Sequence, residues 1–304
     1  MIKYSNIWRK ENREVHKFLR AIGFSDITKK DLEMILDEVI TRPEIMKITK
    51  DSEGNEFAEL SGSFAANAGI TVRGTYQEDD SFHMDYYYPY VFGTSITTNE
   101  QIDVEKHAEK ESYAGVCDEV NLGVTLIFYI QNVADYLAET NRHLSKIHYG
   151  AMLAGLSTEG KILCPVVERK KNDVPAIQKN DRHNQLIAQA REGDEDAIES
   201  LTLEDMDTYA LLSQRVMKED IFSIVKSTFM PFGIESDQYT VLGEIIDCVT
   251  MENKLTHEKL YGMKLLCNNI QFDVCINEKD LLGEPAIGRR FRGNVWMQGN
   301  LCLE

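Results

Sequence analysis

Much of the chain after residue 44 alternates apolar and polar side chains with a period of two, the pattern of strands with one buried face. The clearest case is FHMDYYYPYVFG at residues 82–93, where one parity is aromatic or apolar at every position. Side chains two residues apart share a face of a sheet. The chain is therefore expected to build its core on antiparallel sheets.

In three segments the apolar side chains recur instead with the period of a helix. Residues 15–22 have apolar side chains at helical spacing and stop at Gly23. Residues 28–42 begin with Thr28 as the N-cap and Asp31 three positions later, and Pro43 ends them. A third helix is predicted to begin at Val133. Residues 1–170 are thus predicted to be an α+β domain, an antiparallel meander with flanking helices.

The 304 residues suggest two domains. The meander is expected to close with a hairpin over 150–166 that turns at Glu159–Gly160. Residues 171–217 are polar and then acidic, which predicts a linker followed by short acidic helices. Residues 218–304 show three long strands, a short helix and a last long strand, an order that fits a small OB-like β-barrel domain.

The charge of the chain limits its partners. Lys and Arg number 33 against 50 Asp and Glu, a formal net charge of −17. An acidic chain repels phosphate backbones, so nucleic acid is an unlikely partner. The N-terminus has no signal-peptide pattern, and the apolar run at 124–130 is too short to cross a bilayer. The sequence predicts a cytoplasmic protein without a membrane association.

The six cysteines have no C-x-x-C spacing, which predicts free, inert thiols. The sequence also contains no phosphate-binding glycine loop, nucleophile elbow or paired-histidine zinc motif. No metal and no cofactor are predicted.

The tyrosines at 86, 88 and 90 allow two interpretations. Aromatic faces can stack a ligand, or the rings can pack inside the protein beneath a helix with their hydroxyls hydrogen-bonded. The strand before them has a matching apolar parity, and Pro89 lacks the amide donor that a central strand needs. These two observations favour packing, with the aromatic strand at or near an edge.

Two groups of residues are candidates for a site. His83 and Asp85 have the same parity and could form a catalytic acid–base pair, although two polar residues on a solvated face are the favoured explanation. Near the C-terminus, one parity of 288–303 combines guanidinium, amide and indole groups, which can bind an anion or a planar polar group. The alternative for this row is cross-strand pairing, or coverage by the first domain or a partner. The predicted binding residues are Arg290, Arg292, Asn294, Trp296 and Gln298.

The segment FDVCINEKDLLGEPAIGRRFRGNVWMQG at 272–299 resembles an uncharacterised family from anaerobic Gram-positive bacteria, described as a domain of unknown function. HKFLRAIGFS at 16–25 is similar to the start of the same family, so the resemblance extends over the whole chain. It implies no activity and no catalytic residue.

These observations predict a non-enzymatic binding or protein-interaction module. Its partner is expected to be another protein, a second copy of the chain or a small anionic ligand. The alternative is an enzyme that acts on a small anionic substrate in a cleft between the domains, with His83 and Asp85 or the C-terminal row supplying the reactive groups.

Overall fold

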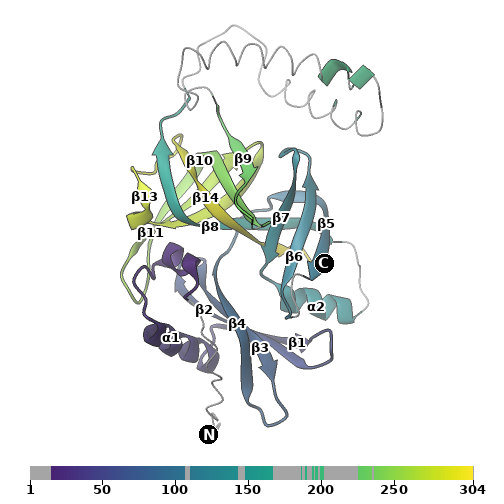
Figure 1. Ribbon diagram of the computed structural model, residues 1–304, viewed down its shortest axis with the longest axis vertical. Coiled ribbons are helices and arrows are strands. Elements are labelled where there is room, and N and C mark those ends of the chain that lie inside the picture. The colour runs from purple at the N-terminus through teal and green to yellow at the C-terminus, as the bar shows by residue number, and fades with distance from the viewer. Residues whose placement is uncertain are drawn as a thin grey trace.

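The structure is a computed structural model that describes residues 15–106, 110–142, 148–166, 225–234 and 236–303, with a few positions between 186 and 201. In this part of the chain the fold is mainly β with a few helices, and it consists of a four-stranded sheet and a ten-stranded sheet (Figure 1). The prediction of antiparallel strands with flanking helices is confirmed at this level.

The four-stranded sheet is the meander expected for the first part of the chain. Its strands pair antiparallel in chain order. They are β1 (Ile45–Lys50), β2 (Glu56–Ala65), β3 (Ala68–Tyr76) and β4 (Phe82–Val91). The strand with Pro89 is an edge strand, as predicted from its missing amide donor.

Two helices precede this sheet, η1 (Lys17–Ile22) and α1 (Lys29–Thr41). The first is a 3-10 helix and not the α-helix that its spacing suggested, and it ends at Gly23 with φ of 94°. The second begins as predicted, because the backbone N–H of Asp31 donates to Thr28 Oγ1 at 3.2 Å. Leu32, Leu36 and Val39 form the buried face of α1, which packs against β2 and β3.

The ten-stranded sheet holds the remaining strands, and the helix α2 (Val133–Asn141) follows β7. A short 3-10 helix, η2 (Glu278–Asp280), precedes β13. The strands are β5 (Thr98–Lys106), β6 (Tyr113–Glu119), β7 (Val124–Ile130), β8 (His148–Leu163), β9 (Thr228–Pro231), β10 (Gln238–Glu252), β11 (Lys259–Cys267), β12 (Ile270–Asn277), β13 (Leu281–Leu282) and β14 (Arg290–Leu301).

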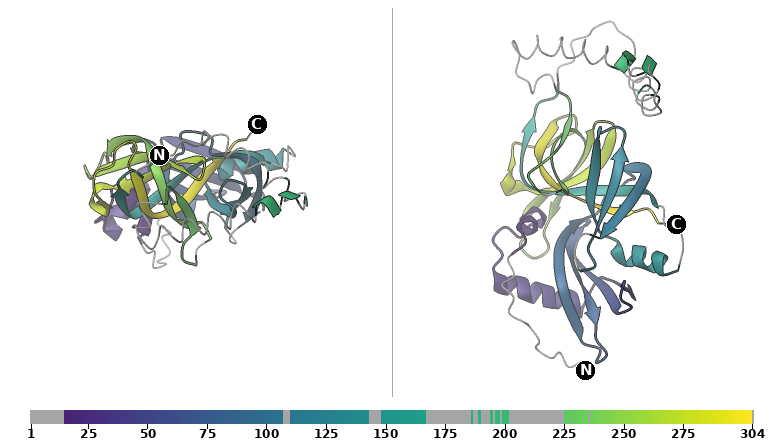
Figure 2. Two further views of the ribbon diagram at one scale, coloured as in Figure 1. Left: turned by 90° about the horizontal axis from the view of Figure 1, so that it is seen from above. Right: turned by 45° about the vertical axis from the view of Figure 1, so that its right-hand side comes forward.

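The long strands β8 and β14 pair antiparallel and form the centre of this sheet. On one side, β10, β11 and β12 complete a five-stranded ring with them, closed by the parallel pairing of β12 with β8. On the other side, β5, β6 and β7 connect β8 back to β14. The four-stranded sheet lies beneath this assembly, with η1 in contact with β4, β8 and β12 (Figures 1 and 2).

The hairpin predicted at Glu159–Gly160 is wrong, because β8 continues through these residues as one strand. Gly160 is required by packing and not by a turn. A Cβ atom at this position would lie 2.4 Å from Cε2 of Phe291, whose ring fills the space beside the β8 backbone. The glycine therefore permits the close approach of β14 to β8.

The ring combines strands from both sides of the predicted linker, since β8 comes from residues 148–163 and the others from 238–301. It is not clearly an OB fold. The linker and acidic helices predicted for 171–217 lie, apart from a few positions, outside the described residues. The separate domain at 218–304 stays a prediction.

Two clusters of buried side chains form the core. One fills the interior of the ten-stranded sheet and includes Phe128, Phe272 and Phe291. The other lies between the helices η1 and α1, the four-stranded sheet and the outer surface of the ring, and includes Phe18, Ile70 and Trp296. No helix in the described part of the chain is both long and apolar enough to cross a membrane.

Candidate functional site

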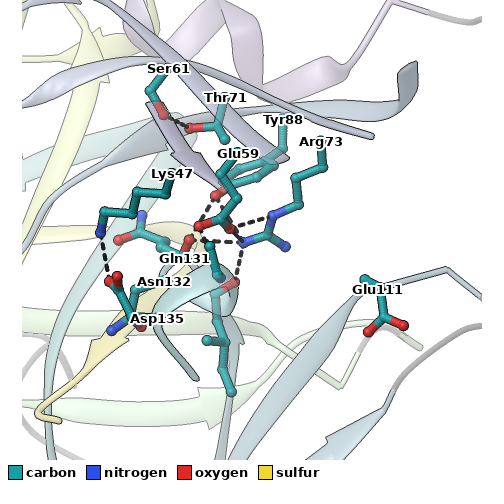
Figure 3. Close-up of polar contacts among 12 residues, drawn as sticks. Lys47, Glu59, Ser61, Thr71, Arg73, Tyr88, Glu111, Gln131, Asn132 and Asp135 are labelled. Atoms are coloured by element: carbon teal, nitrogen blue, oxygen red, sulfur yellow. Dashed lines mark hydrogen bonds and ion pairs between the residues drawn. The ribbon is translucent and has the colours of Figure 1, made fainter. Parts of the chain in front are cut away.

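A polar cleft of about 410 Å³ opens between the four-stranded sheet and the segment where β7 continues into α2. One wall is the face of β1–β4 that points away from α1, and the other comes from the residues after β7, from α2, and from β8 and β14. The polar residues that line it are Lys47, Glu59, Ser61, Thr71, Tyr88, Gln131, Asn132, Asp135 and Asn300. Figure 3 shows most of these side chains and their contacts.

Behind the cleft wall, Arg73 on β3 is fully buried and forms an ion pair with Glu59 on β2 at 2.6 Å. The two residues are direct neighbours in the β2–β3 register. The guanidinium also donates to the carbonyls of Ile130 and Gln131 at 3.0 and 2.8 Å. Its remaining acceptors are the hydroxyls of Tyr86, Tyr88 and Tyr129. A buried charge needs such partners, and here they join the two sheets.

The second oxygen of Glu59 binds the start of α2. The N–H of Ala134 donates to Glu59 Oε2 at 3.0 Å, whereas the N-cap residue Asn132 makes no capping bond with its own side chain. Asn132 instead bonds both the N–H and the carbonyl of Leu301 on β14. A carboxylate at a helix N-terminus is favourable, so Glu59 fixes α2 against the sheet.

Tyr88 and Tyr129, two of the tyrosines around Arg73, remain protonated. Burial lowers the pKa of Arg73, but the surrounding tyrosines and Glu59 outweigh this effect, and the pKa is raised above its usual value. Burial raises the pKa of Tyr88 well above its usual value, although Arg73 opposes the shift. These two tyrosines act as neutral hydrogen-bonding groups around one buried cation.

Arg73 also begins a chain of hydrogen bonds between side chains along the cleft wall. The guanidinium can only donate, so the Tyr88 oxygen accepts from it at 3.2 Å and the Tyr88 hydroxyl donates to the carbonyl of Gln131 at 3.1 Å. Thr71 also hydrogen-bonds the Tyr88 hydroxyl, and this contact lowers the Tyr88 pKa. Ser61 Oγ lies 2.8 Å from Thr71 Oγ1, and either hydroxyl can be the donor. In both cases the Ser61 oxygen can accept a further hydrogen bond on the cleft wall.

At the mouth of the cleft, Lys47 on β1 and Asp135 on α2 form a half-exposed ion pair at 2.5 Å. Deeper in, the Gln131 amide donates to the carbonyl of Val91 at 2.9 Å and to Gln298 Oε1 at 2.8 Å, and it accepts from Asn300 at 3.1 Å. The opposite charges at the mouth neutralise each other. The cleft presents amides, hydroxyls and paired charges.

The candidate pair His83 and Asp85 lies outside the cleft. The register of β3 and β4 passes from Arg73–Tyr86 to Gly74–Met84, so Asp85 is the extra residue of a β-bulge. His83 is exposed on β4, and Asp85 is half-buried. The structure does not place either residue beside the cleft-lining groups.

The predicted row on β14 lies largely against other parts of the same chain. Trp296 is buried, stacks on Phe18 with ring centroids 5.2 Å apart, and donates to Asp237 at 2.7 Å. Gln298 donates to the carbonyl of Pro89 at 2.9 Å and so bonds the edge of β4. Coverage by the first part of the chain is one of the alternatives that the sequence allows for this row.

Two of the other three residues of the row, Arg290 and Asn294, bind nearby segments. Arg290 is buried and donates to the carbonyls of Cys164 and Val225 at distances of 2.5 to 2.9 Å. Asn294 accepts from Thr240 at 2.6 Å, and Arg292 is half-buried beside it on β14. The binding role of the row stays a prediction.

Sequence reasoning missed Glu59, Arg73 and Gln131. The signal was a pair of opposite charges inside two otherwise apolar strands, EFAELSGSF and GITVRGTY. The sequence predicts packing for the tyrosines, and Tyr86 and Tyr88 pack around Arg73 on the sheet face away from α1 and not beneath a helix. Tyr90 is buried and stacks on Phe92.

The six cysteines are free, and Cys117, Cys267 and Cys275 are buried. Burial raises the pKa of Cys267 and of Cys275 to about 12, which disfavours the reactive thiolate. Cys164 is exposed, and Cys248 and Cys302 are half-buried. Within the described ranges, His, Cys, Asp and Glu form no group of three or more suited to a metal ion.

Comparison with known proteins gives a family and no relative of known activity. No curated protein and no solved structure matches the chain. A protein family described as "Domain of unknown function, E. rectale Gene description (DUF3881)" matches residues 19–299. The resemblance to an uncharacterised family is thereby confirmed, while the link to anaerobic Gram-positive bacteria stays a prediction. The chain belongs to the DUF3881 family of unknown function.

Proposed function

We propose that this protein is a non-enzymatic binding module that holds a small uncharged polar molecule in the cleft between the two sheets. The observation that carries the proposal is the chain of hydrogen bonds that begins at Arg73 and ends at Ser61. At its end, whichever hydroxyl of the Ser61–Thr71 pair donates, Ser61 Oγ can accept from a ligand hydroxyl or amide on the cleft wall.

The charges around the cleft favour an uncharged ligand over an anion. Glu59 and Asp135 both line it, and the one cation among the lining residues, Lys47, is paired with Asp135. Arg73 lies behind the wall with its donors already bonded. Both lining carboxylates are paired, so no lining cation is left over to attract an anion, and a neutral molecule needs none. The small anionic ligand predicted from the sequence stays a prediction that the same experiment tests.

The apolar part of the lining fits a molecule with both hydroxyl and C–H faces. Phe92, Met152 and Leu301 contribute apolar surface among the polar groups. A volume of about 410 Å³ falls within the range of small-molecule sites, which are apolar with a few placed polar groups. Polyols and sugars have this mixture of surfaces.

Three predictions from the sequence are kept as proposals: the cytoplasmic location, the OB-like barrel and the protein partner. Free cysteines are typical of a reducing compartment, which supports a cytoplasmic location. The five-stranded ring supports comparison with OB-like barrels, although its strands come from both parts of the chain. The proposal of a protein partner or self-association is taken up below.

The proposal is tested by amide chemical-shift mapping with defined probes at millimolar concentration. The neutral probes are myo-inositol and glucose, and the charged probes are acetate and inorganic phosphate. We expect a neutral probe to shift resonances of cleft residues, and Ser61→Ala to weaken this binding. Ser157→Ala is the matched control, because Ser157 is buried on β8 and bonds the Asn294 carbonyl outside the cleft.

Two results would refute the proposal. If neither neutral probe shifts the cleft residues, the cleft is a structural junction between the sheets. If phosphate or acetate binds there and the neutral probes do not, the ligand is an anion and the charge argument is wrong.

A further inference from the structure

A second, apolar groove of about 470 Å³ lies on the opposite side of the four-stranded sheet, between α1 and the loop that joins β10 to β11. Phe24, Ile27 and Ile35 line it from the η1–α1 segment, and Leu255 lines it from the loop. Two of its apolar side chains are strongly exposed, Met34 at 55% and Leu255 at 49%. Exposed apolar side chains that share one groove indicate an interaction site more strongly than isolated ones.

The walls of this groove are fixed by hydrogen bonds between distant parts of the chain. The Asn253 side chain is buried, donates to the carbonyl of Ile22 at 2.7 Å, and accepts from the N–H groups of Leu255 and Thr256. Thr256 donates to the carbonyl of Gly23 at 2.6 Å. Because both walls are bonded to each other, the groove exists before any partner arrives, which reduces the entropy lost on binding.

The close contact at Gly23 also depends on the residue type. Its φ is +94°, and a Cβ atom there would lie 2.6 Å from the Cβ of Asn253. A glycine at this position therefore allows the loop to pack against the end of η1.

The rim of the groove is acidic. Its charged lining residues are all carboxylates: Asp26, Asp31, Glu38 and Glu258. Lys279 compensates part of this charge, because it pairs with Glu258 at 2.6 Å and with Asp26 at 3.7 Å. Asp31 and Glu38 lie one above the other along the exposed face of α1, on either side of Met34. This half of the rim favours a cationic partner.

We propose that this groove is a docking site for a short protein segment that combines apolar side chains with Lys or Arg. Apolar side chains of the segment contact Met34 and Leu255, and its cations lie beside Asp31 and Glu38. Methionine adapts its shape to different apolar partners and is frequent on peptide-binding surfaces. The site does not depend on the cleft proposed above, since the two share no lining residue.

The experiment uses the full chain and three fluorescein-labelled heptapeptides, with binding followed by fluorescence anisotropy. The probe has the sequence Lys-Leu-Ile-Lys-Trp-Leu-Arg. In one control peptide Glu replaces every basic residue, and in the other Ser replaces every apolar residue. We expect the probe to bind and the two control peptides to bind more weakly. Added salt should weaken the binding of the probe.

Substitutions in the protein identify the site. Met34→Lys and Leu255→Lys are each expected to lower the affinity for the probe about tenfold or more, as for residues at the centre of an interface. Glu38→Lys should weaken it less. The matched control is Met46→Lys on β1, because Met46 is exposed to 56%, almost the same as Met34, and lies outside the groove.

Three outcomes would overturn the proposal. The first is equal binding of the acidic peptide, which would remove the charge argument. The second is unchanged probe binding by Met34→Lys, which would place the peptide elsewhere. The third is a dimer in sedimentation that Met34→Lys dissociates, which would make a second copy of the chain the occupant.

Discussion

Arg73 and Glu59 face each other across β3 and β2 at 2.6 Å, and each side chain also bonds the segment where β7 turns into α2. The pair therefore joins two sheets, and its loss should affect the whole fold.

Removal of one member of this pair is expected to destabilise the protein strongly. Arg73→Met leaves the Glu59 carboxylate buried without its cation, which costs about 3–5 kcal/mol in comparable pairs. The double variant Glu59→Leu with Arg73→Met should recover part of the loss. Urea denaturation measures both, and Lys47→Met is the control because its pair with Asp135 is half-exposed. Equal stability of Arg73→Met and the wild type would show that the pair contributes little.

His16 is expected to make stability fall at acidic pH. Burial, assisted by Lys17, lowers its pKa from 6.5 to about 4, and its Nδ1 accepts from the N–H of Phe18 at 3.4 Å. The unfolded chain therefore binds a proton more tightly than the folded one between these pH values. The free energy of unfolding is therefore unaffected by His16 protonation above pH 6.5. It decreases by at most about 3 kcal/mol as the pH falls toward 4.

The measurement for His16 is thermal unfolding of the wild type and His16→Gln from pH 4 to 7.5, a range set around the two pKa values. The difference between the two proteins should change with pH. His83→Gln is the control, since His83 is exposed on β4. A pH-independent difference would mean that folding does not change the pKa of His16.

Trp296 is expected to contribute to stability, because it packs against Phe18, His16 and Tyr129 inside the chain. Trp296→Ala should destabilise the protein by about 3–5 kcal/mol, the range for large aromatic residues in cores. Trp296→Phe should cost less. Thermal unfolding measures the stability of each variant, and sedimentation measures its assembly state. A changed assembly state with unchanged stability would instead support the binding role predicted for Trp296.

A fragment of residues 218–304 is expected to be unfolded when expressed alone. The ring needs β8, which pairs with β14 over twelve residues and closes the ring against β12. Without β8 both strands expose an unpaired edge. Amide dispersion in the NMR spectrum tests this, and a well-dispersed spectrum would support the separate domain predicted from the sequence.

The sequence by itself determined the local structure. Thr28 and Gly23 mark helix ends because their chemistry satisfies the backbone at those ends, whatever lies around them. The strands at 238–252, 259–267 and 270–277 follow from alternation, which depends only on one face being buried. The edge position of Pro89 follows from its missing amide donor.

Only the tertiary structure decided which faces meet. Gly160 resembles a turn residue in the sequence, but it lies in a continuous strand because the Phe291 ring occupies the space of its Cβ. Trp296 has the parity predicted for an outward face, and η1 covers that face. Arg73 is buried because its hydrogen-bond acceptors converge on it from several strands. They are Glu59, three tyrosine hydroxyls, and the carbonyls of Ile130 and Gln131. Contacts between residues far apart in the chain depend on the packing of whole sheets, which local periodicity does not encode.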